Sequence, residues 1–153
     1  MENIGKLELA HSGLYEIEVN DNGDTIVLDA EDIELPLKLN KMLEDCEKAE
    51  KKAILQSKVI DKKKVEQKGL ITNHDEEYVK LYKQAYTELR KAIDGFLGEG
   101  ACQKIFGRRN YLSMWKDLME ALNPHLQKIG ALQNNTKDII AQKYGNNDED
   151  VIE

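Results

Sequence analysis

The chain has 153 residues, of which 33% are charged and 6% aromatic, and its 29 acidic and 22 basic residues give a net charge of -7. An acidic surface repels polyanions, so we expect no nucleic acid as a partner. No run of about 18 apolar residues occurs and residues 1–6 contain no apolar signal-peptide region, so we expect no membrane segment and a cytoplasmic location.

Two alternating segments near the start predict a β-hairpin over residues 14–28. In the first segment, glutamates separate the residues of one apolar face, which are Tyr15, Ile17 and Val19. The second segment, Thr25 to Leu28, follows a turn that contains Asn22-Gly23, a strong hairpin signal. Leu7 to Leu9 could add a third strand, because an isolated two-stranded hairpin is marginal in water.

The apolar period changes to that of a helix after Asp29, and we predict a helix over residues 30–67. Six residues spaced three or four apart form one stripe: Leu35, Leu39, Met42, Cys46, Ala49 and Ala53. Asp29 or Asp32 could cap the N-terminus, since Pro36 is tolerated in a first turn. Gly69 is then expected to close the helix at its C-terminus.

Three further helices are predicted, over residues 74–97, 101–106 and 111–132. Asn73 and Glu76 resemble a capping box before the first, and Gly98 is expected to end it. Gly107 should end the short second helix. Asn110 could cap the third, which Pro124 should bend or split because it removes an internal hydrogen bond.

Together these elements predict an α+β, predominantly helical fold. The N-terminal β-hairpin, of two or three strands, is followed by a bundle of three to four helices with a glycine-rich hinge. Residues 1–132 are expected to form a single domain. Residues 133–153 read as a polar, acidic tail that could contain one short helix.

The sequence predicts no catalytic, cofactor or metal site, and we expect no enzyme. The three histidines, His11, His74 and His125, lack the spacing of a helix-borne metal site. Gly98-Glu99-Gly100 follows a helix rather than a strand, which indicates a helix end and not a phosphate-binding loop. Both cysteines are expected in the core, although Cys102, with basic residues nearby in sequence, is the better candidate for a nucleophile.

The hinge carries the most specific motif in the chain. The segment from Gly98 to Gly107, GEGACQKIFG, followed by Asn110-Tyr111-Leu112, resembles small tail-region proteins of bacteriophages and prophages of Gram-positive bacteria, which include tail assembly chaperones. The order of elements in residues 14–130 is similar to theirs. The lysine-rich stretch at residues 61–69 and the acidic tail depart from the pattern. The resemblance implies no catalytic residue.

This resemblance implies a non-enzymatic tail assembly protein, a chaperone that binds the tape measure or another tail component and that could itself oligomerise. The candidate partner-binding residues cluster at the hinge: Ile105, Phe106, Tyr111 and Trp115. Packing of the same residues into the core is the competing interpretation. Two other functions stay open, a structural minor tail or connector subunit of the virion and a small cysteine-dependent enzyme.

Overall fold

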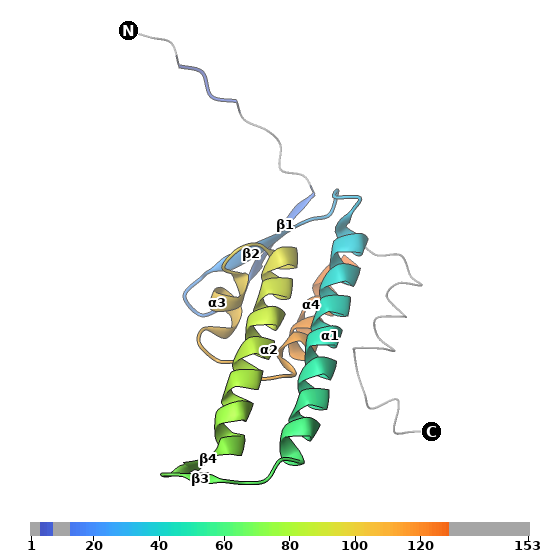
Figure 1. The fold of residues 1–153 in the computed structure, drawn as a ribbon. Coiled ribbons are helices and arrows are strands. Elements are labelled where there is room, and N and C mark those ends of the chain that lie inside the picture. The colour runs from blue at the N-terminus through green and yellow to red at the C-terminus, as the bar shows by residue number, and fades with distance from the viewer. Residues whose placement is uncertain (1–3, 8–12, 129–153) are drawn as a thin grey trace.

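The computed structural model describes residues 4–7 and 13–128. Two long antiparallel helices stand side by side, with a β-hairpin and a short helix beside them and a fourth helix packed across one face (Figure 1). The elements in chain order are β1 Leu14–Glu18, β2 Thr25–Asp29, α1 Leu35–Asp61, β3 Gln67–Lys68, β4 Ile71–Thr72, α2 Asn73–Leu97, α3 Ala101–Phe106 and α4 Met114–Lys128. The predicted α+β, mainly helical fold is therefore confirmed.

The N-terminal hairpin forms as its alternating pattern predicts. Strands β1 and β2 are antiparallel, with Ile17 opposite Ile26. Both of these side chains and Leu28 are buried, so one face of the hairpin joins the core. The proposed third strand at residues 7–9 lies largely outside the described residues.

Helix α1 buries all six residues of the predicted stripe but is shorter than predicted. It starts at Leu35 and not at residue 30, because the Asp29 and Asp32 side chains do not cap it. Each of these carboxylates instead accepts a hydrogen bond from the backbone N–H two residues later, in the turns that precede the helix.

The predicted helical end of α1, residues 62–67, is wrong, because the chain leaves the helix at Lys62 and forms a second small hairpin. Gly69 has a φ of +65° and occupies the first position of the two-residue turn between β3 and β4. Asn73 holds the connection by accepting from the Glu66 N–H and donating to the Lys64 carbonyl. Gly69 therefore serves this turn and not a helix cap.

Helix α2 begins one residue earlier than predicted and has a different capping box. Thr72 accepts a hydrogen bond from the Asp75 N–H, and the Asp75 carboxylate accepts one from the Thr72 N–H. The predicted pair, Asn73 and Glu76, makes no such box. The buried residues of this helix lie four apart and form one apolar stripe: Leu81, Ala85, Leu89, Ile93 and Leu97.

Helix α3 has the predicted bounds, whereas α4 begins three residues later than predicted. Asn110 does not cap α4, because its side-chain oxygen accepts from Arg90 on α2. Pro124 lies inside one continuous α4 and does not split it. The predicted last turn of this helix and the tail at 133–153 lie outside the described residues.

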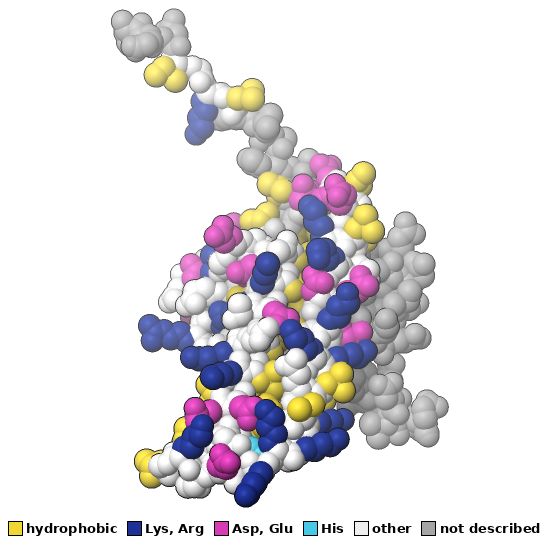
Figure 2. All heavy atoms as spheres, in the orientation of Figure 1, with side chains coloured by type: hydrophobic (Ala, Val, Ile, Leu, Met, Phe, Trp, Pro, Cys, Tyr) yellow, Lys and Arg dark blue, Asp and Glu magenta, His cyan; other side chains and the backbone are white. Residues whose placement is uncertain are grey.

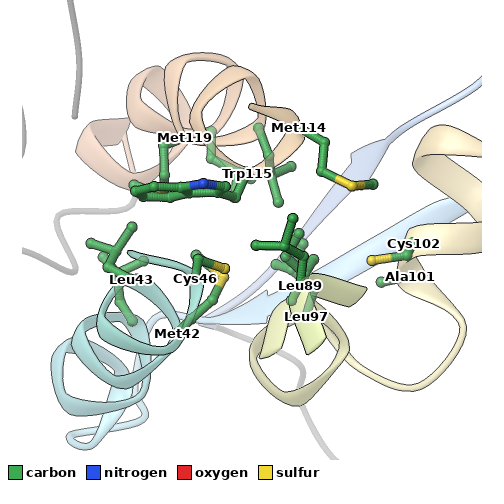
Figure 3. Close-up of a cluster of buried hydrophobic side chains, with 14 of the residues drawn as sticks. Met42, Leu43, Cys46, Leu89, Leu97, Ala101, Cys102, Met114, Trp115 and Met119 are labelled. Carbon is green, nitrogen blue, oxygen red and sulfur yellow. The ribbon is translucent and has the colours of Figure 1, made fainter. Parts of the chain in front are cut away.

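The core lies between the α1–α2 pair, the hairpin and α4. Trp115 points from α4 toward α1, over Leu43 and Cys46 (Figure 3). This arrangement covers one face of the two long helices near the β-hairpin. A smaller buried cluster continues between the far halves of α1 and α2: Ala53, Ile60, Leu81 and Ala85.

Candidate functional site

The glycine-rich hinge, residues 98–110, is a defined turn between α2 and α4. Gly98, Gly100 and Gly107 have φ values of 110°, 85° and 62°, which side chains with a Cβ rarely adopt. Gly98 follows the last residue of α2, and the other two flank α3. The three glycines thus set the path of the chain, as the sequence indicates.

Two side chains of α2 hold this turn in place. The Arg90 guanidinium donates to Asn110 Oδ1 at 2.6 Å and to the carbonyls of Gly107 and Arg109 at 2.8 and 2.9 Å. Asp94 Oδ1 accepts from the Cys102 N–H at 2.9 Å and supplies the N-terminal cap that Gly100 cannot. These contacts therefore hold the hinge in one conformation, and we refer to residues 98–110 below as the joint.

Contacts with the β-hairpin hold the joint from its other side. Asn20 donates from Nδ2 to the Lys104 carbonyl at 3.0 Å, and Lys104 Nζ donates to the Thr25 carbonyl at 3.1 Å. These bonds join the end of α3 to the turn and second strand of the hairpin. The segment from Gly98 to Gly107 is thus held by contacts from both α2 and the β-hairpin.

The four predicted partner-binding residues do not share one exposed surface. Trp115 is 1% exposed and belongs to the core. Ile105, Phe106 and Tyr111 are half-buried, and the Phe106 and Tyr111 rings meet edge to face with centroids 6.2 Å apart. Only these three retain surface that a partner could touch.

Tyr111 is held in the joint by its hydroxyl as well as by its ring. Burial raises the pKa of Tyr111, and the hydrogen bond from its hydroxyl to Asp117, at 2.7 Å, acts in the same direction. The Arg109 guanidinium lies 4.9 Å from the ring centroid, a cation–π distance. These contacts order the start of α4 and leave Tyr111 little freedom to rearrange.

Both cysteines are buried, and neither is poised as a nucleophile. Burial raises the pKa of Cys102 to about 12, with the nearby Asp94 carboxylate acting in the same direction. Burial likewise raises the pKa of Cys46 to about 12. Since the thiolate is the reactive form, both side chains remain protonated and unreactive at neutral pH.

The histidines of the described region have structural partners. His125 Nδ1 lies 3.1 Å from the Tyr15 hydroxyl and links α4 to β1, and His74 Nε2 lies 2.8 Å from the Lys63 carbonyl. Within residues 4–7 and 13–128, no group of three His, Cys, Asp or Glu side chains could hold a metal ion. In the same residues, no helix is long and apolar enough to cross a membrane.

A groove runs along the seam between α1 and α2. Three hollows line it, and neighbouring hollows share residues, with Glu88 common to the first two and Leu81 common to the last two. The hollow near the start of α1 has a volume of about 500 Å³, and that near Ile60 about 370 Å³. Between them lies a much smaller hollow of about 10 Å³, where Lys52 on α1 pairs with Glu88 on α2 at 3.5 Å. We call this feature the α1–α2 groove.

The α1–α2 groove has an apolar floor and charged margins. Figure 2 shows Lys, Asp and Glu side chains along both helices, with hydrophobic atoms visible between them. At the larger hollow the floor includes Met42, Ala92 and Phe96. At the smaller hollow, Val59 is 60% exposed beside the buried Ile60 and Leu81. Exposed apolar surface of this kind, with a polar rim, is typical of protein-binding sites.

Ion pairs join charged side chains at and beside the margins of the groove. The hydrogen bond from Lys38 raises the pKa of that lysine and lowers the pKa of its partner, Asp32. A hydrogen bond to Asp45 raises the pKa of Lys41 in the same way. The groove thus presents charged side chains beside an apolar floor.

Sequence reasoning missed both the groove and the anchors of the joint. The groove margins look like ordinary solvated helix faces until α1 and α2 are placed together. Asp94 precedes α3 by seven residues and Arg90 precedes Asn110 by twenty, so neither has a local pattern that signals its role. One available signal was Gly95, a glycine inside a strongly periodic helix.

Comparison with protein families relates the chain to a family of unknown function. A protein-family model described as a family of unknown function (DUF6673) matches residues 22–150. Searches of curated proteins and of solved structures return no match to the chain. The match covers the second strand of the hairpin and every helix described above.

Proposed function

Since the chain belongs to this family of unknown function, we propose its role from its own residues: it is a non-enzymatic tail assembly protein of a bacteriophage or prophage. It acts as a chaperone that binds the tape measure or another tail component in the host cytoplasm. The observation that carries the proposal is the α1–α2 groove, an apolar surface with charged margins that no described part of the chain covers.

The shape of the groove suits a chaperone for an elongated helical protein. An assembly chaperone must cover apolar surface on a partner while the complex stays in solution, which requires an apolar floor and a charged rim together. The hinge motif adds support, because its resemblance is to tail-region proteins that include such chaperones. The net charge of -7 also favours a soluble complex.

The cysteine-dependent enzyme is the weaker alternative. Such an enzyme needs an accessible thiol with a lowered pKa, whereas burial raises the pKa of Cys102 to about 12 and leaves the side chain 2% exposed. The thiol donates to the Arg90 carbonyl at 3.7 Å, a packing contact within the joint. These observations favour a binding role.

Co-expression tests the proposal. The chain, carrying an affinity tag, is expressed with the tape measure protein of the phage or prophage genome that the proposal assigns it to, and the soluble fraction is captured on the tag. We expect the tail protein to co-purify and to be more soluble than when expressed alone. No association with any tail component, and no gain in solubility, would count against the assembly role.

A second measurement separates a chaperone from a structural subunit of the virion. A chaperone leaves the assembled tail, so mass spectrometry of purified particles should not detect this chain. Its presence at a fixed ratio to the tail proteins would instead identify a minor tail or connector subunit.

A further inference from the structure

Gly95 has no structural reason to be glycine. It lies inside α2, where glycine costs about 0.5–1 kcal/mol relative to alanine. Its φ is not positive, and a Cβ built at this position would meet no atom within 4 Å apart from its chain neighbours and the nearby backbone of its own helix. By contrast, the three glycines of the hinge, Gly98, Gly100 and Gly107, all have a positive φ. The space above Gly95 is therefore kept open at a cost to the helix.

That open space is the larger hollow of the α1–α2 groove. Gly95 lines it together with Met42, Ala92 and Phe96. Its rim carries four lysines, Lys38, Lys41, Lys48 and Lys91, and two carboxylates. We call it the lysine-rimmed hollow.

The rim is basic on a protein of net charge -7. Lys38 pairs with Asp32 and Lys41 pairs with Asp45, so both partners are close in the sequence. Within the described part of the chain, Lys48 and Lys91 make no ion pair. They stand on α1 and α2, and both are exposed. An occupant that carries carboxylates on its flanks would therefore find complementary charge on each side.

We propose that the α1–α2 groove binds an amphipathic helix of a protein partner, with a bulky apolar side chain over Gly95 and acidic residues facing Lys48 and Lys91. This inference names the partner class for the proposed assembly role and rests on it. The missing side chain at Gly95 leaves room for one from the partner. Lys48 and Lys91, which pair with no carboxylate of the described residues, then meet the carboxylates that flank the apolar stripe of the bound helix.

The walls of the groove favour a helix over an extended peptide. Both walls are helices, whose backbone groups are already paired within α1 and α2, so an extended segment would find no strand edge to pair with. A helix satisfies its own backbone and packs by its side chains. From Met42 to Ile60 the groove follows α1 for about 27 Å at 1.5 Å per residue, the length of a five-turn helix.

Two fluorescein-labelled probe peptides test the proposal by fluorescence anisotropy with the full chain. Both are helices of about 20 residues with the same leucine stripe, but one carries glutamates beside the stripe and the other lysines. We expect the glutamate peptide to bind about tenfold more tightly, and the difference to shrink as salt rises. Equal binding of the two peptides, or binding of neither, would overturn the proposal.

Variants locate the binding site. Gly95→Leu fills the lysine-rimmed hollow and should lower the affinity for the glutamate peptide about tenfold. Its helix content and unfolding temperature should stay the same or rise. Lys83→Leu adds the same side chain to α2 outside the groove and should leave binding unchanged. Lys48→Glu with Lys91→Glu should remove the preference for the glutamate peptide. Unaltered affinity in Gly95→Leu would place the peptide elsewhere and refute the assignment.

Two competing occupants belong to the chain itself. If a second copy fills the groove, light scattering will show a dimer that Gly95→Leu dissociates. If the acidic segment Asp148 to Ile152 fills it, replacing Val151 and Ile152 with serine in the full chain will tighten binding of the glutamate peptide. Either result overturns the assignment of the groove to a partner helix.

The test of the groove and the test of the assembly role can fail independently. If the unaltered chain and Gly95→Leu capture a tail protein equally well, the groove is not the binding site, but the assembly role still holds. If the variants change peptide binding as expected but no tail component is captured, the groove binds a helix and the assembly role is wrong.

Discussion

Replacing Arg90 with methionine should loosen the glycine joint and destabilise the whole protein. One guanidinium donates three hydrogen bonds, to Asn110 Oδ1 and to the carbonyls of Gly107 and Arg109, and only the Gly107 bond is partly buried. A charged donor contributes about 1.5–3 kcal/mol when buried and much less when water replaces it. We therefore count the Gly107 bond nearly in full and the others at a fraction, which gives a loss of about 2 kcal/mol in the free energy of unfolding.

Urea unfolding followed by the fluorescence of Trp115 measures this loss. Arg90→Lys keeps the charge but cannot form the fork, so its loss should be about half as large. Arg108→Met, an exposed arginine in the same turn, is the matched control and should stay within about 0.5 kcal/mol of the unaltered protein. A similarly small effect of Arg90→Met would refute the view that α2 side chains hold the joint.

The cap of α3, the glycine inside α2 and the two buried thiols can each be tested by substitution or labelling. Asp94→Ala removes the cap of α3 and should lower the unfolding free energy by about 1 kcal/mol in urea titrations, and a smaller loss in Asp94→Asn would confirm that the side-chain acceptor matters. Gly95→Ala should raise the unfolding free energy by about 0.5–1 kcal/mol, and a decrease would reveal a packing role that the helix does not show. Neither Cys46 nor Cys102 should react with iodoacetamide at pH 8 in the folded protein, whereas both should react in urea; fast labelling of the native chain would contradict their burial.

The same cysteines predict a pH dependence of stability. Burial raises both pKa values from 9.0 to about 12 in the folded chain, so folding favours the protonated thiols. Their contribution is complete below pH 9 and is lost as the pH rises toward 12, because the unfolded chain ionises first. Alanine at both positions should flatten the fall in stability over that range, and an unchanged profile would contradict the burial argument.

Local periodicity is what made most of the fold predictable. The stripe from Leu35 to Ala53, the alternation around Ile17 and the glycines flanking α3 each encode their element within a few residues. The end of α1 was not predictable in this way. Gly69 is as suitable for a helix end as for a two-residue turn, and the contacts of Asn73 with the preceding loop favour the turn.

The candidate site was less accessible to sequence reasoning because it depends on two elements meeting. The aromatic residues near the hinge suggested a partner-binding surface, but Trp115 lies in the core, because α4 packs it against α1. Lys48 and Lys91 look like solvated positions until α1 and α2 pair and place them around one hollow. Gly95 departs from the usual avoidance of glycine inside a helix, and it lines that hollow.

Co-purification from cells that express the chain with the tape measure protein of the same phage or prophage genome tests the central claim most directly. The unaltered chain and Lys83→Leu should capture the tail protein in soluble form, and Gly95→Leu should capture much less although it folds. Absence of the tail protein from the fraction captured by the unaltered chain would contradict the account.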